Sequence, residues 1–171
     1  MPENTFDRID QAILTTLQNN ARVSNKELAG TVGLAPSSCL ERVRRLHERG
    51  VLKGYGANVN PIALGVGLQA FVAVVLSKHS RALVDGFRDH LSTLPEVINI
   101  YHMGGQNDFL VHVAVRDASH LRDLALNAFT TRPEVARIET TLVYEHIPAQ
   151  MWPNYRTEPE QETPSDTKRA R

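Results

Sequence analysis

Arginine and serine side chains are concentrated in one short stretch, at a spacing suited to binding a polyanion. On a helix they would form a single ridge, which comprises Ser38, Arg42, Arg45 and Arg49. The planar guanidinium group fits phosphate oxygens and the guanine edge in the DNA major groove. Ser37 and Ser38 can also bond phosphate, and the N–H groups at a helix N-terminus attract anions. The stretch therefore predicts a DNA-contacting helix.

The same helix has a second interpretation, a solvated face of paired charges. Glu41 could pair with Arg45, and Glu48 lies near Arg44. Two preceding short helices favour the first interpretation, because they complete a helix-turn-helix. The predicted DNA-binding residues are Ser37, Ser38, Glu41, Arg42, Arg45 and Arg49.

A turn in the second half of the chain, Gly104–Val111 with sequence GGQNDFLV, could hold a small zwitterion. Backbone N–H groups around a glycine turn can bind a carboxylate, and a side chain such as Asp108 can pair with an α-ammonium group. The alternative is an ordinary hairpin turn, since glycine, asparagine and aspartate are the usual turn residues.

Other reactive side chains point to no site. The seven histidines show no metal-ligand spacing, although His102 and His112 could face each other across the predicted hairpin. Cys39 falls on the apolar side of its helix, beside Val43 and Leu46. No nucleophile elbow, phosphate loop or dinucleotide motif is present. We expect no metal, no cofactor and no catalytic residue, with an enzyme or a pure ligand-binding or assembly module as alternatives.

Apolar periodicity and turn residues predict three helices in the first part of the chain, over residues 7–19, 24–33 and 36–49. Ser24 with Glu27 forms a capping box, and Ser38 with Glu41 offers a second one. Gly33 suits the end of the second helix, and Pro36 suits the start of the third.

The remaining chain predicts the order β-α-β-β-α-β, a ferredoxin-like domain. The expected strands and helices are residues 68–76, 79–94, 97–103, 108–115, 119–129 and 135–146. The fold class is therefore α+β, with an N-terminal three-helix, winged-helix-like domain before the ferredoxin-like βαββαβ domain. The predicted domains are residues 1–60 and 61–150, and a disordered tail over 151–171.

Composition permits this organisation and excludes other classes. The chain has 171 residues, a formal net charge of zero and one cysteine, so it forms no intrachain disulfide. Residues 1–60 carry eight basic and six acidic side chains, and five of the basic ones lie between Arg42 and Lys53. No signal peptide or membrane span is visible, which predicts a soluble cytoplasmic protein.

The motifs resemble those of the Lrp/AsnC (feast/famine) family of transcriptional regulators. The resemblance covers residues 6 to 147 and is carried by RVSNKELA, VGLAPSSCLERVRRL and GVLKGY, followed by the glycine–aspartate–aromatic pattern of Gly105, Asp108 and Phe109. It implies a regulator that binds double-stranded DNA and a small effector, commonly an amino acid, at a loop between two subunits. It also implies homodimers that assemble further, often to octamers.

The effector-binding residues expected on this basis belong mainly to the turn, with one addition made from sheet geometry. They are Met103, Gly105, Gln106, Asn107, Asp108 and, on the last strand, Thr140. The family often has tyrosine where this chain has Phe109, so any contact with a tyrosine hydroxyl would be missing here.

Overall fold

The structure, a computed structural model, describes residues 6–148 and 151–155. It divides into two compact units. The first contains the described residues up to Ala57 together with those from Pro148 on, and the second spans Asn58–Ile147. The predicted tail lies largely outside the described residues.

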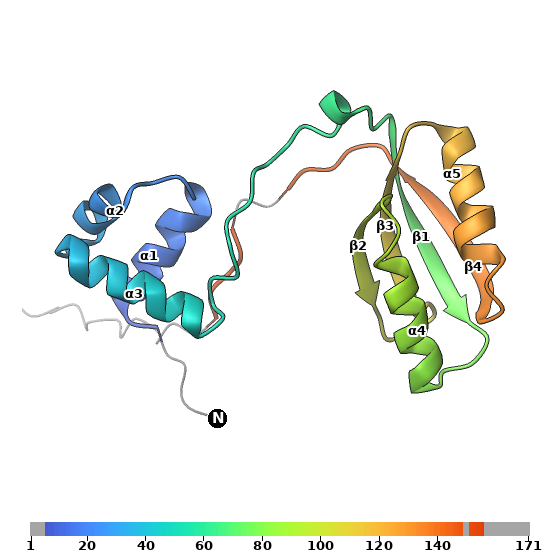
Figure 1. Ribbon diagram of the computed structural model, residues 1–171, viewed down its shortest axis with the longest axis horizontal. Helices are drawn as coiled ribbons and strands as arrows, with labels where there is room; N and C mark the ends of the chain where they lie inside the picture. Colours follow the sequence, from blue (N-terminus) through green and yellow to red (C-terminus); the bar gives the residue numbers. More distant parts are fainter. Residues whose placement is uncertain (1–5, 149–150, 156–171) are drawn as a thin grey trace, which may run out of the picture. The chain divides into compact units, whose positions relative to one another are not determined.

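Three helices build the first unit, as predicted: α1 (Arg8–Asn19), α2 (Asn25–Val32) and α3 (Pro36–Glu48) (Figure 1). The Ser24–Glu27 capping box forms at the start of α2. Gly33 ends this helix with φ of 72°, in the left-handed region that glycine adopts without strain. These two signals fix where the turn before α3 begins.

The start of α3 differs from the prediction. Ala35 is its N-cap and makes no side-chain capping bond, so the second capping box, Ser38 with Glu41, is wrong. The physical reason is Pro36, which occupies the first helical position and moves the helix start ahead of Ser38. In the described part of this unit no strand accompanies the helices, so no β-wing is present.

The core of the first unit is small and apolar. It comprises Phe6, Ile13, Leu17, Leu28, Ala29, Cys39 and Leu46. Cys39 and Leu46 come from the predicted apolar side of α3, which confirms that face. Burial raises the pKa of the Cys39 thiol. The opposite side of α3 is thereby presented to solvent.

The second unit is a four-stranded antiparallel sheet with helices, and its chain order is βαββαβ. Its elements are a short η1 turn (Ile62–Leu64), β1 (Leu68–Leu76), α4 (Arg81–Leu91), β2 (Val97–His102), β3 (Phe109–Val115), α5 (Ala118–Leu124), a π-helical turn η2 (Ala125–Thr130) and β4 (Val135–Val143). The strands lie in the order β2-β3-β1-β4. This confirms the predicted ferredoxin-like fold.

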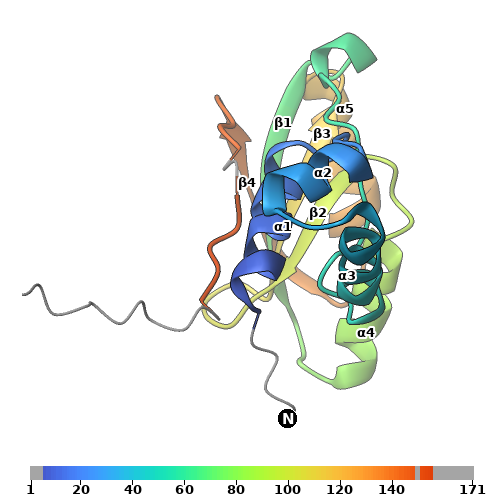
Figure 2. The same cartoon turned by 90° about the vertical axis from the view of Figure 1, so that its left-hand side faces the viewer.

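Helices α4 and α5 cover one face of this sheet (Figures 1 and 2). Alternate residues of β1, from Ala70 to Leu76, are buried there against Phe87 and Leu91 of α4. Neither of these two helices covers the opposite face of the sheet, which carries Phe71, Leu110 and His112. This second surface is called the open sheet face below.

His112 is nonetheless almost fully buried, with 7% of its surface exposed. Phe71 stacks on its ring at a centroid distance of 5.0 Å, and Gln69 Oε1 lies 2.9 Å from its Nε2. His102 stacks instead on Phe109, on the helix-covered side. The prediction that His102 and His112 could face each other is therefore wrong, because they lie on opposite faces of the sheet.

Candidate nucleic-acid interface and effector loop

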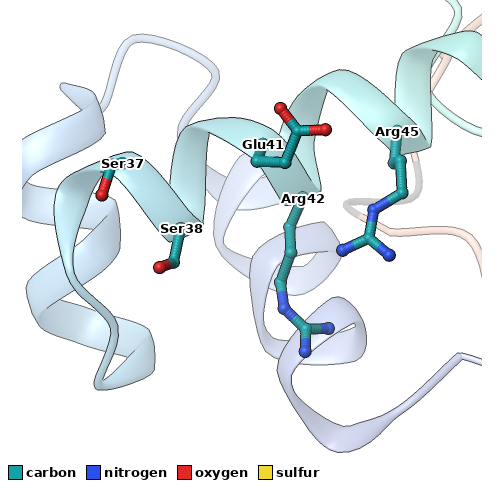
Figure 3. A pocket seen from close by; sticks show the side chains of 5 residues that line it. All are labelled: Ser37, Ser38, Glu41, Arg42 and Arg45. Atoms are coloured by element: carbon teal, nitrogen blue, oxygen red, sulfur yellow. The ribbon is translucent and has the colours of Figure 1, made fainter.

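The exposed side of α3 contains a pocket that gathers most of the predicted DNA-binding residues. Its lining is Ser37, Ser38, Glu41, Arg42 and Arg45 (Figure 3). The serines occupy the first turn of α3, where the helix dipole is positive and no side chain caps the N-terminus. The pocket thus brings together hydroxyl groups, helix N–H groups and guanidinium groups. All of these can donate hydrogen bonds to phosphate oxygens and to acceptor atoms on base edges.

Arg42 has a role that sequence patterns did not reveal. Its Nη1 lies 2.6 Å from Asp7 Oδ2 and 2.9 Å from Asp10 Oδ1, both at the start of α1. In Figure 3 its side chain runs toward another helix, whereas Glu41 points away from it. The side chain is only 23% exposed. Arg42 therefore joins α3 to α1, and little of its side chain is exposed in the pocket.

The contacts of Arg42 shift the pKa values of Asp7 and of Arg42 itself. Burial opposes ionisation of Asp7, but hydrogen bonds from the Asp10 N–H group and from Arg42 outweigh it and lower the pKa of Asp7. Hydrogen bonds to Asp7 and Asp10 raise the pKa of Arg42. Both groups are charged at neutral pH, so the link between the helices persists there.

The other arginines of α3 divide into paired and unpaired groups. Arg44 forms the predicted pair with Glu48, at 2.8 Å. The guanidinium carbon of Arg49 lies 5.5 Å from the centre of the Phe6 ring, away from the pocket lining. The predicted pair of Glu41 with Arg45 is not formed, and within the described ranges Arg45 makes no ion pair. Arg45 is therefore the pocket's most available cation.

The β2–β3 turn, Met103–Asp108, is closed by a bond from Met103 N to Asp108 O of 2.9 Å. Gly105 has φ of 134°, which requires glycine. Gly104, Gly105 and Gln106 are exposed, and Asn107 is half-buried. The turn thus presents main-chain groups to solvent, as a carboxylate site would need.

The predicted effector residues are not all close together. Met103, Gly105, Gln106, Asn107 and Asp108 share the turn. Thr140 lies opposite Val72, and β1 separates its strand from β3, so the structure does not bring it to the turn within one chain. Phe109 is fully buried against Phe87 and points into the core. Its missing hydroxyl leaves the surface of the turn unchanged.

Asp108 is largely occupied within the chain. Its Oδ2 accepts from Leu76 N at 2.7 Å, and its Oδ1 lies 2.8 Å from His79 Nε2. Sequence reasoning missed His79, as it missed the pairing of Asp7 and Asp10 with Arg42. Each of these contacts joins residues far apart in the chain, and no local pattern announces them. Among the described residues no cluster of potential metal ligands occurs, and none of the described helices could cross a membrane.

Two family models match the chain. An AsnC-type helix-turn-helix domain matches residues 6–47, and an Lrp/AsnC ligand binding domain matches residues 69–153. The first match contains α1, α2 and nearly all of α3, and the second contains the whole sheet except Leu68, the first residue of β1. Together they include every predicted DNA-binding and effector-binding residue except Arg49.

Individual proteins agree with the family models. The HTH-type transcriptional regulator AldR of Mycolicibacterium smegmatis is 41% identical over 142 residues, which is 83% of each chain. A transcriptional regulator from Neisseria meningitidis, solved as its L-methionine complex, superposes with a TM-score of 0.79 at 29% identity, covering 85% of this chain and 94% of that one. A feast or famine regulatory protein from M. tuberculosis, also with L-methionine, has a TM-score of 0.76, 34% identity and coverages of 84% and 95%.

Proposed function

Because this chain belongs to the Lrp/AsnC family of transcriptional regulators, we propose that it reads DNA with the α3 pocket and responds to a free amino acid bound at the β2–β3 turn. The observation that carries the proposal is the joint match of a helix-turn-helix and a ligand-binding domain in one chain. Two sites on separate units are what an effector-controlled regulator requires.

The DNA-binding half of the proposal depends on α3 as the recognition helix. Arg45 would reach phosphate or a guanine edge, and Ser37 and Ser38 would bond phosphate at the positive end of the helix. Glu41 could accept from a cytosine amino group. Arg42 would orient α3 through its ion pairs with α1, and Arg49 would contact DNA at the C-terminal end of α3.

The effector half depends on the relatives and on the turn. Two similar solved regulators hold L-methionine. The exposed main chain of the turn supplies donors for a carboxylate, and its polar side chains Gln106 and Asn107 can select among side chains of the effector. Thr140 could join this site only from another subunit or after assembly.

A homodimer would complete the molecule. The open sheet face carries half-buried Phe71 and Leu110 and exposed Tyr101, which a second copy could cover. Two recognition helices in a dimer also suit two half-sites of an operator. Further assembly of dimers, up to octamers, would let effector binding alter DNA affinity through the assembly state. Such a regulator would work in the cytoplasm, where the chromosome is accessible, and would not act as an enzyme.

The DNA half can be tested without knowing the operator. Sequences selected from a random duplex pool are labelled, and their affinity for the full chain is measured by fluorescence anisotropy. Arg45→Ala should weaken binding by about tenfold, the loss of one good base or phosphate contact. Arg44→Ala is the matched control, because Arg44 lies on the same helix but is paired with Glu48, and it should change affinity less than twofold. If the pool yields no preferred sequence, the proposal that the α3 pocket recognises specific DNA is wrong.

The effector half is tested by thermal unfolding against each of the twenty amino acids, beginning with L-methionine. A ligand present at about 100 times its dissociation constant should stabilise the protein by roughly 2.7 kcal/mol. The same amino acid should then change the affinity for the selected DNA. If no amino acid shifts the unfolding midpoint, the second unit does not sense amino acids.

A further inference from the structure

Asp108 joins the β2–β3 turn to neighbouring strands through its main chain. Its N–H group donates to Val74 O at 2.9 Å, and its carbonyl accepts from Met103 N at 2.9 Å. The residue therefore marks the point where the hairpin turn meets the end of β1.

The carboxylate extends this junction. β3 begins at Phe109, opposite Val74, so the N–H group of Leu76 has no partner residue on β3. Asp108 Oδ2 accepts from this N–H group at 2.7 Å and replaces the missing strand residue. The side chain is 14% exposed, and a bond between a carboxylate and a shielded backbone N–H group is among the stronger ones.

The second oxygen contacts the connection between β1 and α4. Asp108 Oδ1 lies 2.8 Å from Nε2 of His79, whose side chain is 68% exposed. An exposed pair of this kind holds weakly. The carboxylate thus makes two contacts within its own chain, a strong one with the N–H group of Leu76 and a weaker one with His79.

We propose that Asp108 is a positioning residue of the effector site and that His79 is its second anchor. This inference rests on the proposed function. Asp108 and His79 together hold the β2–β3 turn against the end of β1, and the main chain of Gly104–Asn107 binds the effector. Both oxygens of the carboxylate already hold a contact within the chain, so we assign it to holding the turn rather than to pairing with the effector's ammonium group.

The two roles of Asp108 predict different behaviour of its conservative variant. Asp108→Asn keeps an oxygen that can accept from Leu76 N but loses the negative charge and the second acceptor oxygen that face His79. For a positioning residue, Asp108→Asn should match His79→Ala, and both should be milder than Asp108→Ala. For a direct ammonium partner, Asp108→Asn should be as damaging as Asp108→Ala, because an amide carries no charge.

Hydrogen exchange of the Met103 and Asp108 amides, which donate to Asp108 O and Val74 O at the base of the turn, measures the positioning without any ligand. In the full chain, Asp108→Ala should speed exchange by about tenfold, as expected for loss of a bond to a charged group. His79→Ala and Asp108→Asn should each speed it by about two- to threefold. Arg81→Ala is the matched control, because Arg81 is a neighbouring exposed cation that pairs with Asp85, and it should leave exchange unchanged. Unchanged exchange in His79→Ala would overturn the role of His79.

Calorimetric titration with L-methionine, or with whichever amino acid shifts the unfolding midpoint, then tests the effect on binding. Variants with faster amide exchange should bind the amino acid more weakly, so Asp108→Ala should lose more affinity than His79→Ala and Asp108→Asn. Equal loss of binding in Asp108→Asn and Asp108→Ala, with wild-type exchange in Asp108→Asn, would overturn the proposal in favour of direct contact. If no amino acid binds, the proposed effector fails, while the exchange rates still decide whether Asp108 and His79 hold the turn.

Discussion

Gly67 and Arg116 approach so closely that a Cβ atom on Gly67 would lie 2.2 Å from the carbonyl oxygen of Arg116. Gly67 N also donates to Val115 O at 3.1 Å, so the two chain segments are already bonded where β1 begins. Gly67→Ala should therefore lower the free energy of unfolding by about 1–3 kcal/mol or more, as overpacking against backbone does. Urea unfolding of the full chain measures it.

The same substitution elsewhere in the unit provides the control. Gly86 lies within α4, and a Cβ atom there would meet nothing within 4 Å. Gly86→Ala should stabilise the protein by about 0.5–1 kcal/mol, because alanine is the better helix former. If both variants lowered the free energy of unfolding by similar amounts, the close approach of the Arg116 carbonyl oxygen would not be what excludes a Cβ atom at residue 67.

Arg42→Ala should destabilise the first unit. It leaves Asp10, which is 14% exposed, without its cation, at a cost of about 1–3 kcal/mol. Asp7 is 52% exposed and should contribute less. Arg44→Ala removes a pair with 69% and 57% exposed partners and should cost about 0.5 kcal/mol or less, which makes it the comparison for thermal unfolding.

Cys39 can report on the first unit alone, because it is the chain's single cysteine and is fully buried. Burial also raises the pKa of its thiol, so little thiolate is present at neutral pH. A thiol reagent such as Ellman's should react with the native protein only as fast as this unit opens, and immediately in urea. Arg42→Ala should speed labelling, whereas Gly67→Ala should not. Rapid labelling of the unmodified native protein would contradict the burial of Cys39.

His112 should make stability fall in mild acid. Burial, and then the proximity of His146, lower its pKa from the ordinary value of 6.5. The unfolded chain therefore binds the proton first as pH falls. The contribution of neutral His112 is complete above about pH 6.5 and is lost as pH falls through the folded-state pKa. Urea unfolding at pH 7.5 and pH 5 should show a larger loss for the native chain than for His112→Gln, and equal losses would contradict the assignment.

Local signals predicted most of the fold. Helix periodicity, the Ser24–Glu27 capping box and Gly33 placed the first two helices, because such signals act within a few residues. The order of strands and helices in the second unit followed from alternation and turn residues. The face of His112 was also within reach, since it is three positions after Phe109 and so must point the other way from it.

The sites were less accessible from the sequence. The residues lining the α3 pocket were predicted because one helix carries all of them. The partners of Arg42 and Asp108 were not, since Asp10 is 32 residues from Arg42 and Leu76 is 32 residues from Asp108. Only the packing of helices and the register of strands bring such residues together. A charged residue that looks free for a ligand in sequence can thus be engaged within the chain.

The internal pairing of α3 also affects how the protein would compete with cations condensed on DNA. Arg42 and Arg44 already face carboxylates of their own chain, so Arg45 and Arg49 are the arginines of this segment that are left to displace those cations. Each neutralised phosphate steepens the dependence of the logarithm of affinity on the logarithm of salt concentration by about 0.9. A single copy should therefore release few counterions and bind weakly at any sequence, and tight binding would come from several copies held together on one operator.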